Sequence, residues 1–218
     1  MSSYSLSIEP NDPNLQKKVV QLKPISGICV FISIGKSSSV DVYTIRDWAI
    51  QHSQLTARVN DMLATHWPTS INENGLMYIL DSASNNSRLV VYGLLDLLDN
   101  TGQEGIMKDL IALRSDRILP IALFDDIRIS AVWSDNIFPV SLQPGKVEYI
   151  GADITLASQL LLAANKRELI VNESLYERAV HLSKDAEELE FSARIVEQLK
   201  GPETFILKDS KRTHLIYR

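Results

Sequence analysis

The chain has 218 residues, a length that suits one hydrophobic core with a short appended segment. Hydrophobic residues make up 45% of it and charged residues 22%, a composition that excludes a disordered or fibrous protein. The formal net charge of −5 offers no general cationic surface for a phosphate backbone, so nucleic acid is not an expected partner.

A single cysteine, Cys29, lies in an apolar run and has no cysteine partner in the chain, so we expect it to be a buried thiol. No apolar stretch approaches the roughly 18 residues that a membrane-spanning helix needs, and the polar N-terminus lacks a signal-peptide core. We therefore expect a cytoplasmic protein without a membrane span.

The start of the chain differs in composition from the rest. Residues 1–24 are rich in Pro, Ser and Asn and are predicted to form a polar N-terminal arm, which leaves residues 25–218 as a single domain. The continuous apolar run "GICVFISI" (27–34) predicts a buried strand, and the "GKSSS" after it predicts a loop. Apolar residues at helical spacing from 41 to 67 predict a helix that ends at Pro68.

The remaining elements alternate between strand and helix patterns. "NENGLMYIL" (72–80) predicts a hairpin with an Asn-Gly turn, and 87–115 predicts one interrupted helix or two. Further strands are expected at 117–124, 127–133 and 204–208, and the stretch 149–179 reads as loop, helix, turn, strand and helix. This order predicts an α+β sandwich with helices on one side of a mostly antiparallel sheet.

Within 149–179, two local signals predict how the helices begin. Asp153 precedes a helical pattern and is predicted to be an N-terminal cap. Ser174 with Glu177 has the spacing of a capping box, which is a structural role.

The stretch "VEYIGADITLASQLLLAANKRELIVNESLYERA" resembles a motif of class III nucleotidyl cyclases, the adenylyl and guanylyl cyclase family. That family carries "Y-T-hydrophobic-I-G-D-A-V-N-L-A-A-R-L" followed by "A-x-x-G-E-I-L-V-S-E-x-x-Y". "GICVFISIGKSSS", "NENGLMYIL", "LPIALFDDIRISAV" and "LKGPETFILK" are similar to four other motifs of the family, in the same order. The resemblance covers about residues 27–208 and implies the ferredoxin-like cyclase sandwich.

Cyclisation in this family implies a pair of metal ions held by two aspartates, which activate the attacking hydroxyl and neutralise developing charge. At the first aspartate position this chain has Ser33, and at the second it has Asn74. A hydroxyl and an amide are poor substitutes for charged oxygens around magnesium, so we expect no metal cofactor. Glu73 would supply one carboxylate only if the turn shifted by a residue.

The other half of the family's site implies an Asn and an Arg four residues apart on a helix, where they orient the ribose and stabilise phosphate charge. Thr155 and Gln159 stand at these two positions. Gln cannot offer the charged fork with which Arg holds phosphate. Because family members pair head to tail, a chain lacking one half could still complete a partner's site, but this chain lacks both halves.

The sequence therefore favours a catalytically inactive cyclase-like domain that acts as a dimerising or regulatory interaction module in signalling. Its expected partner is a second copy or another cyclase-like or signalling protein, and its expected contact residues are Leu76, Met77, Leu156 and Leu160. The alternative is a divergent cyclase or nucleotide sensor that uses Mg²⁺ or Mn²⁺ with ATP or GTP. In that case the loop residues Lys36, Ser37 and Ser38 would hold phosphate.

Overall fold

The structure is a computed structural model, and it describes part of the chain. The described residues are 6–7, 23–34, 53, 55–57, 59–60, 63, 69–72, 75–83, 85–100, 127–143, 146–181, 186–208 and 210–218. The domain boundary predicted at residue 25 coincides with the first residue of a central strand, but the boundary itself remains a prediction.

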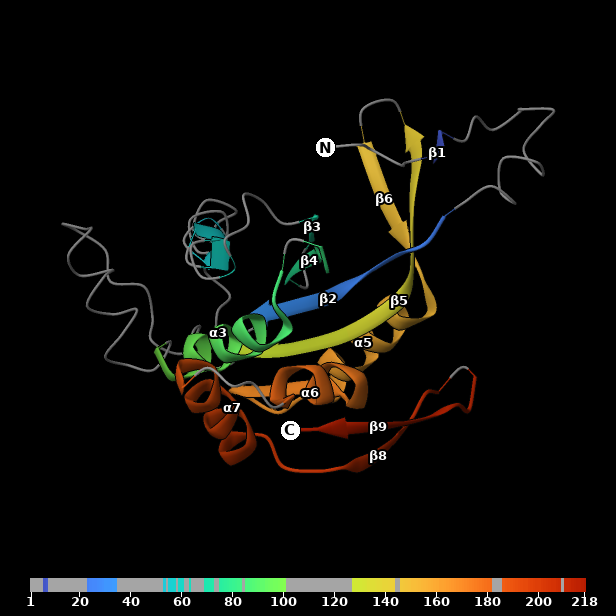
Figure 1. The fold of residues 1–218 in the computed structure, drawn as a ribbon. Coiled ribbons are helices and arrows are strands. Elements are labelled where there is room, and N and C mark those ends of the chain that lie inside the picture. The colour runs from blue at the N-terminus through green and yellow to red at the C-terminus, as the bar shows by residue number, and fades with distance from the viewer. Residues whose placement is uncertain are drawn as a thin grey trace, which may run out of the picture.

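A mixed sheet forms the centre of the described structure (Figure 1). Its main path runs β3-β4-β2-β5-β7-β9-β8, and β1 and β6 pair with β5 beside that path. The strands are β1 (Leu6–Ser7), β2 (Ile25–Ile34), β3 (Ser70–Asn72), β4 (Gly75–Asp81), β5 (Ile127–Gln143), β6 (Lys146–Ile150), β7 (Glu168–Asn172), β8 (Glu203–Ile206) and β9 (Thr213–Tyr217). Among the strand pairs that the structure describes, only β5–β7 and β1–β5 are parallel, so the prediction of a mostly antiparallel sheet is confirmed.

Four helices are described along most of their length, namely α3 (Ser87–Asn100), α5 (Ala152–Ala163), α6 (Glu173–Val180) and α7 (Ala186–Gln198). Several residues between 53 and 63 are also helical, as the apolar spacing predicted. The predicted hairpin at 72–80 is confirmed by the β3–β4 pair, and the predicted helix from 87 is confirmed as far as residue 100. The strand predicted at 117–124 lies outside the described residues.

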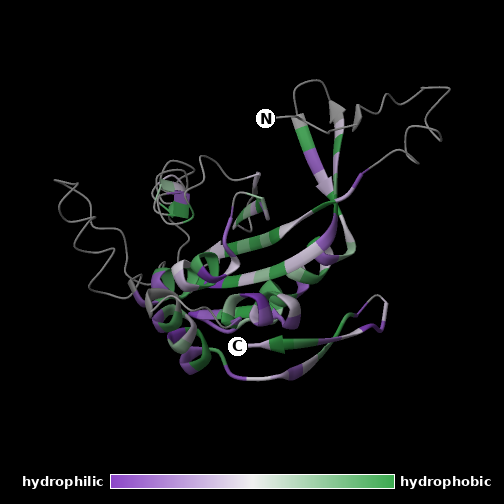
Figure 2. Cartoon of the chain, viewed as in Figure 1, coloured by the Kyte–Doolittle hydropathy of each residue, from purple (hydrophilic) through white to green (hydrophobic). Residues whose placement is uncertain are grey.

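The central strands bury both of their faces, because alternate side chains point to opposite sides of the sheet. Ile28, Val30 and Ile32 of β2 belong to one apolar cluster, whereas Cys29 belongs to a second. In Figure 2, hydrophobic residues concentrate along the strands β2, β5 and β9, while α7 shows many hydrophilic ones. A strand buried on both faces explains why 27–34 reads as a continuous apolar run.

The two faces are covered by different helices. Buried residues of α3, α6 and α7 join the first cluster, with Leu94, Leu175 and Ile195 as representatives. Leu156 and Leu160 of α5 join the second cluster on the opposite face. The prediction that the helices lie on one side is therefore wrong, because α5 follows a hairpin that returns the chain to the other face.

Strand β5 is much longer than the predicted strand at 127–133. Its first part pairs with β2 and β7, and its continuation through Phe138 and Val140 pairs with β6. The β5–β6 hairpin projects from the body of the domain, and β1 lies along its edge (Figure 1). The sequence predicts only a loop through Pro144 and Gly145 at this point, and both residues lie outside the described part of the chain.

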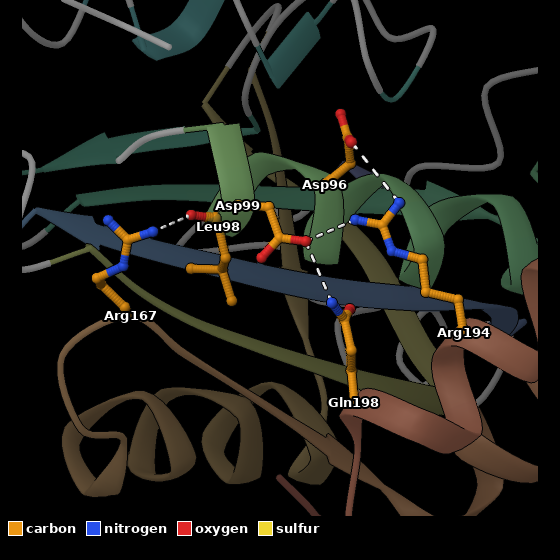
Figure 3. Close-up of polar contacts among 6 residues, drawn as sticks. All are labelled: Asp96, Leu98, Asp99, Arg167, Arg194 and Gln198. Atoms are coloured by element: carbon orange, nitrogen blue, oxygen red, sulfur yellow. Dashed lines mark hydrogen bonds and ion pairs between the residues drawn. The ribbon is translucent and has the colours of Figure 1, made fainter. Parts of the chain in front are cut away.

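Polar contacts fix α3 against its neighbours (Figure 3). Arg194 of α7 places Nη2 2.6 Å from Asp99 Oδ2 on α3, and Gln198 Nε2 donates to the same oxygen at 3.1 Å. Arg167, in the turn before β7, donates from Nη2 to the Leu98 carbonyl at 2.8 Å. A cation on the last carbonyls of α3 favours the negative end of the helix dipole.

Both predicted helix caps differ in the structure. The residue that caps α5 is Gly151, while Asp153 lies in the first turn and accepts a 2.6 Å hydrogen bond from the Ser134 hydroxyl. The residue that caps α6 is Asn172, whose Oδ1 accepts from the Leu175 amide, so Ser174 is not the cap. In α5, the Asp153 side chain bonds to Ser134 of β5 and does not cap the helix. In α6, the cap lies two residues before the position that the spacing predicted.

Candidate functional site

Ser33 lies near the end of β2, half-buried, next to the β3–β4 hairpin. Gly75 begins β4 with a φ of +143°, and a Cβ there would lie 2.0 Å from the Ile32 carbonyl oxygen and 3.0 Å from Ser33 Cα. Only glycine allows this approach of the two backbones. The start of β4 therefore lies directly against the end of β2 that carries Ser33.

A cationic residue stands directly opposite Ser33. The β2–β5 ladder pairs Ser33 with Arg128, and the β5–β7 ladder pairs Arg128 with Glu168. Directly paired residues share a face of the sheet, with Cβ atoms about 5 Å apart. Where a metal centre would need converging carboxylates, Ser33 therefore has a guanidinium-bearing neighbour, and Glu168 lies one strand further away.

Thr155 and Gln159 lie on α5, one turn apart. Thr155 is exposed, and its carbonyl accepts a 2.9 Å hydrogen bond from the Ser158 hydroxyl. Gln159 is half-buried, and its Oε1 accepts from the Lys208 backbone amide at 3.3 Å. In the described part of the chain, neither of these two hydrogen bonds involves Ser33 or its strand β2.

The four predicted contact residues have different surroundings. Leu76, Leu156 and Leu160 are buried inside the domain, with exposed fractions of 1%, 1% and 0%. Their buried side chains leave no surface for a partner, so we assign them to the two cores. Met77 is half-buried on the other side of β4 from Leu76 and is the one predicted contact residue with accessible surface.

Several predicted positions lie outside the described residues. These are Lys36, Ser37, Ser38, Glu73 and Asn74. Their assignments as phosphate-loop residues and as altered metal positions remain predictions from the sequence.

A metal ion needs several His, Cys, Asp or Glu side chains close together. Among the described residues, no group of three or more His, Cys, Asp or Glu side chains lies close enough together to hold one. Cys29 is fully buried, and burial, with a smaller effect of Asp153, raises the pKa of its thiol to about 12. A thiol with so high a pKa is neither a metal ligand nor a nucleophile near neutral pH.

No protein-family model and no curated protein matches this chain. Solved structures do match. The adenylyl cyclase CyaB from P. aeruginosa is 13% identical over 88% of this chain and 92% of its own, with a TM-score of 0.60. The guanylyl cyclase Cya2 is 9% identical over 90% of this chain and 92% of its own, with a TM-score of 0.62. An adenylate cyclase from Trypanosoma brucei, described in its monomeric state, is 12% identical over 88% of each chain, with a TM-score of 0.55. The chain has the class III nucleotidyl cyclase fold.

Sequence reasoning missed two features of this cyclase fold. Ser33 and Arg128 are 95 positions apart in the chain, and only the strand register reveals that they are neighbours. The Ser134–Asp153 contact likewise joins β5 to α5. The alternation of apolar and polar residues in "IRIS" (127–130) could have placed Arg128 on one face of a strand, but it could not have identified the residue opposite.

Among the residues that the structure describes, no helix is long and apolar enough to cross a membrane.

Proposed function

We propose that this cyclase-fold domain is catalytically inactive and acts in signalling by associating with a second copy or with another cyclase-like or signalling protein. The observation that carries the proposal is the pairing of Ser33 with Arg128 at the end of β2. This is the position where the resembling cyclases carry a metal-binding aspartate.

Electrostatics argues against two divalent cations at this position. Two carboxylates would offset the charge of the metal ions, whereas a hydroxyl supplies no charge and an adjacent guanidinium repels a cation. Thr155 and Gln159 also leave the second half of the site without the cation that would hold phosphate. The changes affect both halves, so pairing two such chains would not restore a complete site.

The surface for association is an apolar strip beside α5, formed by Phe31, Met77 and Ile79. Phe31 pairs with Met77, and Cys29 pairs with Ile79, so the three side chains share one face of β2 and β4. All three are half-buried, and Phe31 and Ile79 pack against the cluster that contains α5. A half-covered apolar strip loses further contact with water when a partner covers it, which favours association.

The catalytic part of the proposal is tested with purified protein, ATP or GTP, and Mg²⁺ or Mn²⁺. We expect no cyclic product. As a comparison, the variant with Ser33→Asp and Asn74→Asp should show a metal-dependent rise in melting temperature that the wild-type protein lacks. Turnover by the wild-type protein would overturn the proposal and favour the divergent-enzyme alternative.

The association part is tested by sedimentation velocity at tens of micromolar protein. Wild type should form dimers, and Met77→Glu should be monomeric because it places a charge on the apolar strip. The matched control is Leu162→Glu, since Leu162 is an 80% exposed apolar residue on α5 outside the strip. A wild-type monomer that also fails to bind an active cyclase domain, or equal effects of both variants, would contradict the proposal.

We also propose a cytoplasmic location, because a lone reduced thiol is ordinary there. Fractionation of cells that express the full chain tests this location, and recovery with secreted protein would contradict it.

A further inference from the structure

A cavity of about 540 Å³ lies between the start of α3 and the end of α6, above Trp133 of β5. Trp133 belongs to the cluster on the sheet face opposite α5. The cavity is also at the other end of β2 from Ser33, because Ser82, which lines it, donates its backbone amide to the Ser26 carbonyl at 3.0 Å. We call it the Trp133–Arg178 cavity, and it is separate from the cyclase-type site.

Arg178 is an exposed residue that forms one wall, with its guanidinium over the indole of Trp133. The guanidinium carbon lies 3.8 Å from the ring centroid of Trp133, and the indole is fixed in turn by a 3.1 Å hydrogen bond from Nε1 to Asp135 Oδ1. Within the described part of the chain, Arg178 makes no hydrogen bond or ion pair. A cation–π contact does not use the N–H donors of the guanidinium, so these remain able to bind a carboxylate or phosphate in a bidentate manner.

The opposite wall also suits an anion. Asn86 Oδ1 accepts a hydrogen bond from the Arg88 amide at 2.9 Å, and Ser87, the first residue of α3, lines the cavity. The amino end of a 14-residue helix carries partial positive charge, which adds to the effect of Arg178. Ser82 is a further polar residue of the lining.

The carboxyl end of α6 also reaches the cavity, and its partial negative charge would repel an anion. Arg88 offsets this charge. Arg88 is 6% exposed and donates from Nε to the Ala179 carbonyl at 2.9 Å and from Nη2 to the His181 carbonyl. These bonds neutralise the last carbonyls of α6 and fix its end against α3. The geometry that presents Arg178 to the cavity is therefore built into the fold.

Glu177 adds one carboxylate to the lining, which sets a limit on the ligand. It disfavours a highly charged polyphosphate, but it can accept hydrogen bonds from hydroxyl groups of a ligand that carries a single anionic group. The cavity also falls within the usual range for small organic molecules, roughly 300–1,000 Å³. We propose that the Trp133–Arg178 cavity binds a small organic anion, a carboxylate or phosphomonoester that carries hydroxyl groups.

Calorimetry on the full chain tests this proposal with four probes: glucose 6-phosphate, gluconate, neutral glucose and inorganic phosphate. We expect saturable binding of at least one hydroxylated anion, weaker binding of inorganic phosphate and none of glucose. The two hydroxylated anions distinguish a phosphate ligand from a carboxylate ligand. Absence of saturable binding by both of them would overturn the proposal.

Variants assign the binding to the cavity. Arg178→Met keeps the apolar cover over Trp133 and should weaken binding by about tenfold or more, whereas Arg178→Lys should weaken it less. Arg212→Met is the control, since Arg212 is an exposed arginine outside the cavity. Glu177→Gln should strengthen anion binding a fewfold. Unchanged affinity in a folded Arg178→Met protein would place the binding elsewhere and overturn the assignment.

The test is independent of the proposed association. Met77→Glu changes the apolar strip on the other face of the sheet and should leave anion binding unchanged. Loss of dimers with retained anion binding would support this cavity whatever the fate of the association model.

Discussion

Asn172 and Trp133 join the end of β7 to the middle of β5 through a reciprocal pair of hydrogen bonds. The Trp133 amide donates to Asn172 Oδ1 at 3.0 Å, and Asn172 Nδ2 donates to the Trp133 carbonyl at 3.1 Å. The same Oδ1 accepts from the Leu175 amide at 3.2 Å, which caps α6. One side chain thus continues the β5–β7 ladder beyond its last pair, Ala131 with Val171, and starts the next helix.

Replacing Asn172 with Ala should lower the free energy of unfolding by about 2–3 kcal/mol, because the helix loses its cap and two backbone groups lose their partner. Asn172→Asp should cost less, since the carboxylate still accepts both amide hydrogen bonds but cannot donate to the Trp133 carbonyl. Urea denaturation followed by circular dichroism measures both values. A loss below about 0.5 kcal/mol in the Ala variant would contradict the assigned role.

Gly75→Ala should destabilise the domain by about 2–4 kcal/mol, or prevent folding, because a Cβ there meets the Ile32 carbonyl and the backbone is in a left-handed region. Thermal unfolding measures the loss. The comparison is Asn85→Ala, a change in the exposed turn after β4 that removes one 2.9 Å hydrogen bond to the Asp81 carbonyl and should cost much less. Equal stability of Gly75→Ala and wild type would mean that β4 does not approach β2 this closely.

Stability should fall at alkaline pH because of Cys29. Burial, followed by the charge of Asp153, raises the pKa of its thiol from the usual 9.0 to about 12. Between these two values the unfolded chain loses the proton while the folded chain keeps it, so the contribution of Cys29 is complete below pH 9 and disappears as pH rises toward 12. The slope from this group reaches about 1.4 kcal/mol per pH unit.

Cys29→Ala provides the control for this pH dependence. The variant should show a shallower loss of unfolding free energy above pH 9 than the wild-type protein, although buried Tyr78, whose pKa is also raised by burial, keeps part of the slope. Urea titrations at a series of pH values measure both slopes. Identical slopes would show that the thiol is accessible to water in the folded protein.

Asp99→Asn should lower the free energy of unfolding by about 1 kcal/mol or less, because the Arg194–Asp99 pair is partly exposed to water. The effect should shrink at high salt, which screens the pair. Asp96→Asn is the matched control, since Asp96 lies 3.8 Å from Arg194 and should matter less. Chemical denaturation at low and high sodium chloride concentrations gives the comparison, and a loss independent of salt would contradict an ionic contribution.

The sequence predicted a helix or strand correctly where hydrophobicity or a single glycine is enough to define it. The apolar run at 27–34 became β2 because a strand between two layers buries both faces. The Asn-Gly pair predicted a hairpin, and the register confirms the hairpin but pairs Gly75 with Asn72, so that Gly75 begins β4 where a Cβ would meet the Ile32 carbonyl. Prediction was less successful for β5, whose continuation past Trp133 pairs with β6 instead of ending, and for the caps of α5 and α6.

The order of strand and helix patterns along the chain predicted the α+β class, and the resemblance to the cyclase family predicted the fold. That Ser33, Thr155 and Gln159 stand at the family's carboxylate, amide and guanidinium positions remains a prediction from the same resemblance. Only the three-dimensional fold shows that Arg128 pairs with Ser33, that α5 covers the second face of the sheet, and that Arg178 lies over Trp133 near the start of α3. These relationships join residues far apart in sequence, and strand register and helix packing, which depend on the whole fold, bring them together.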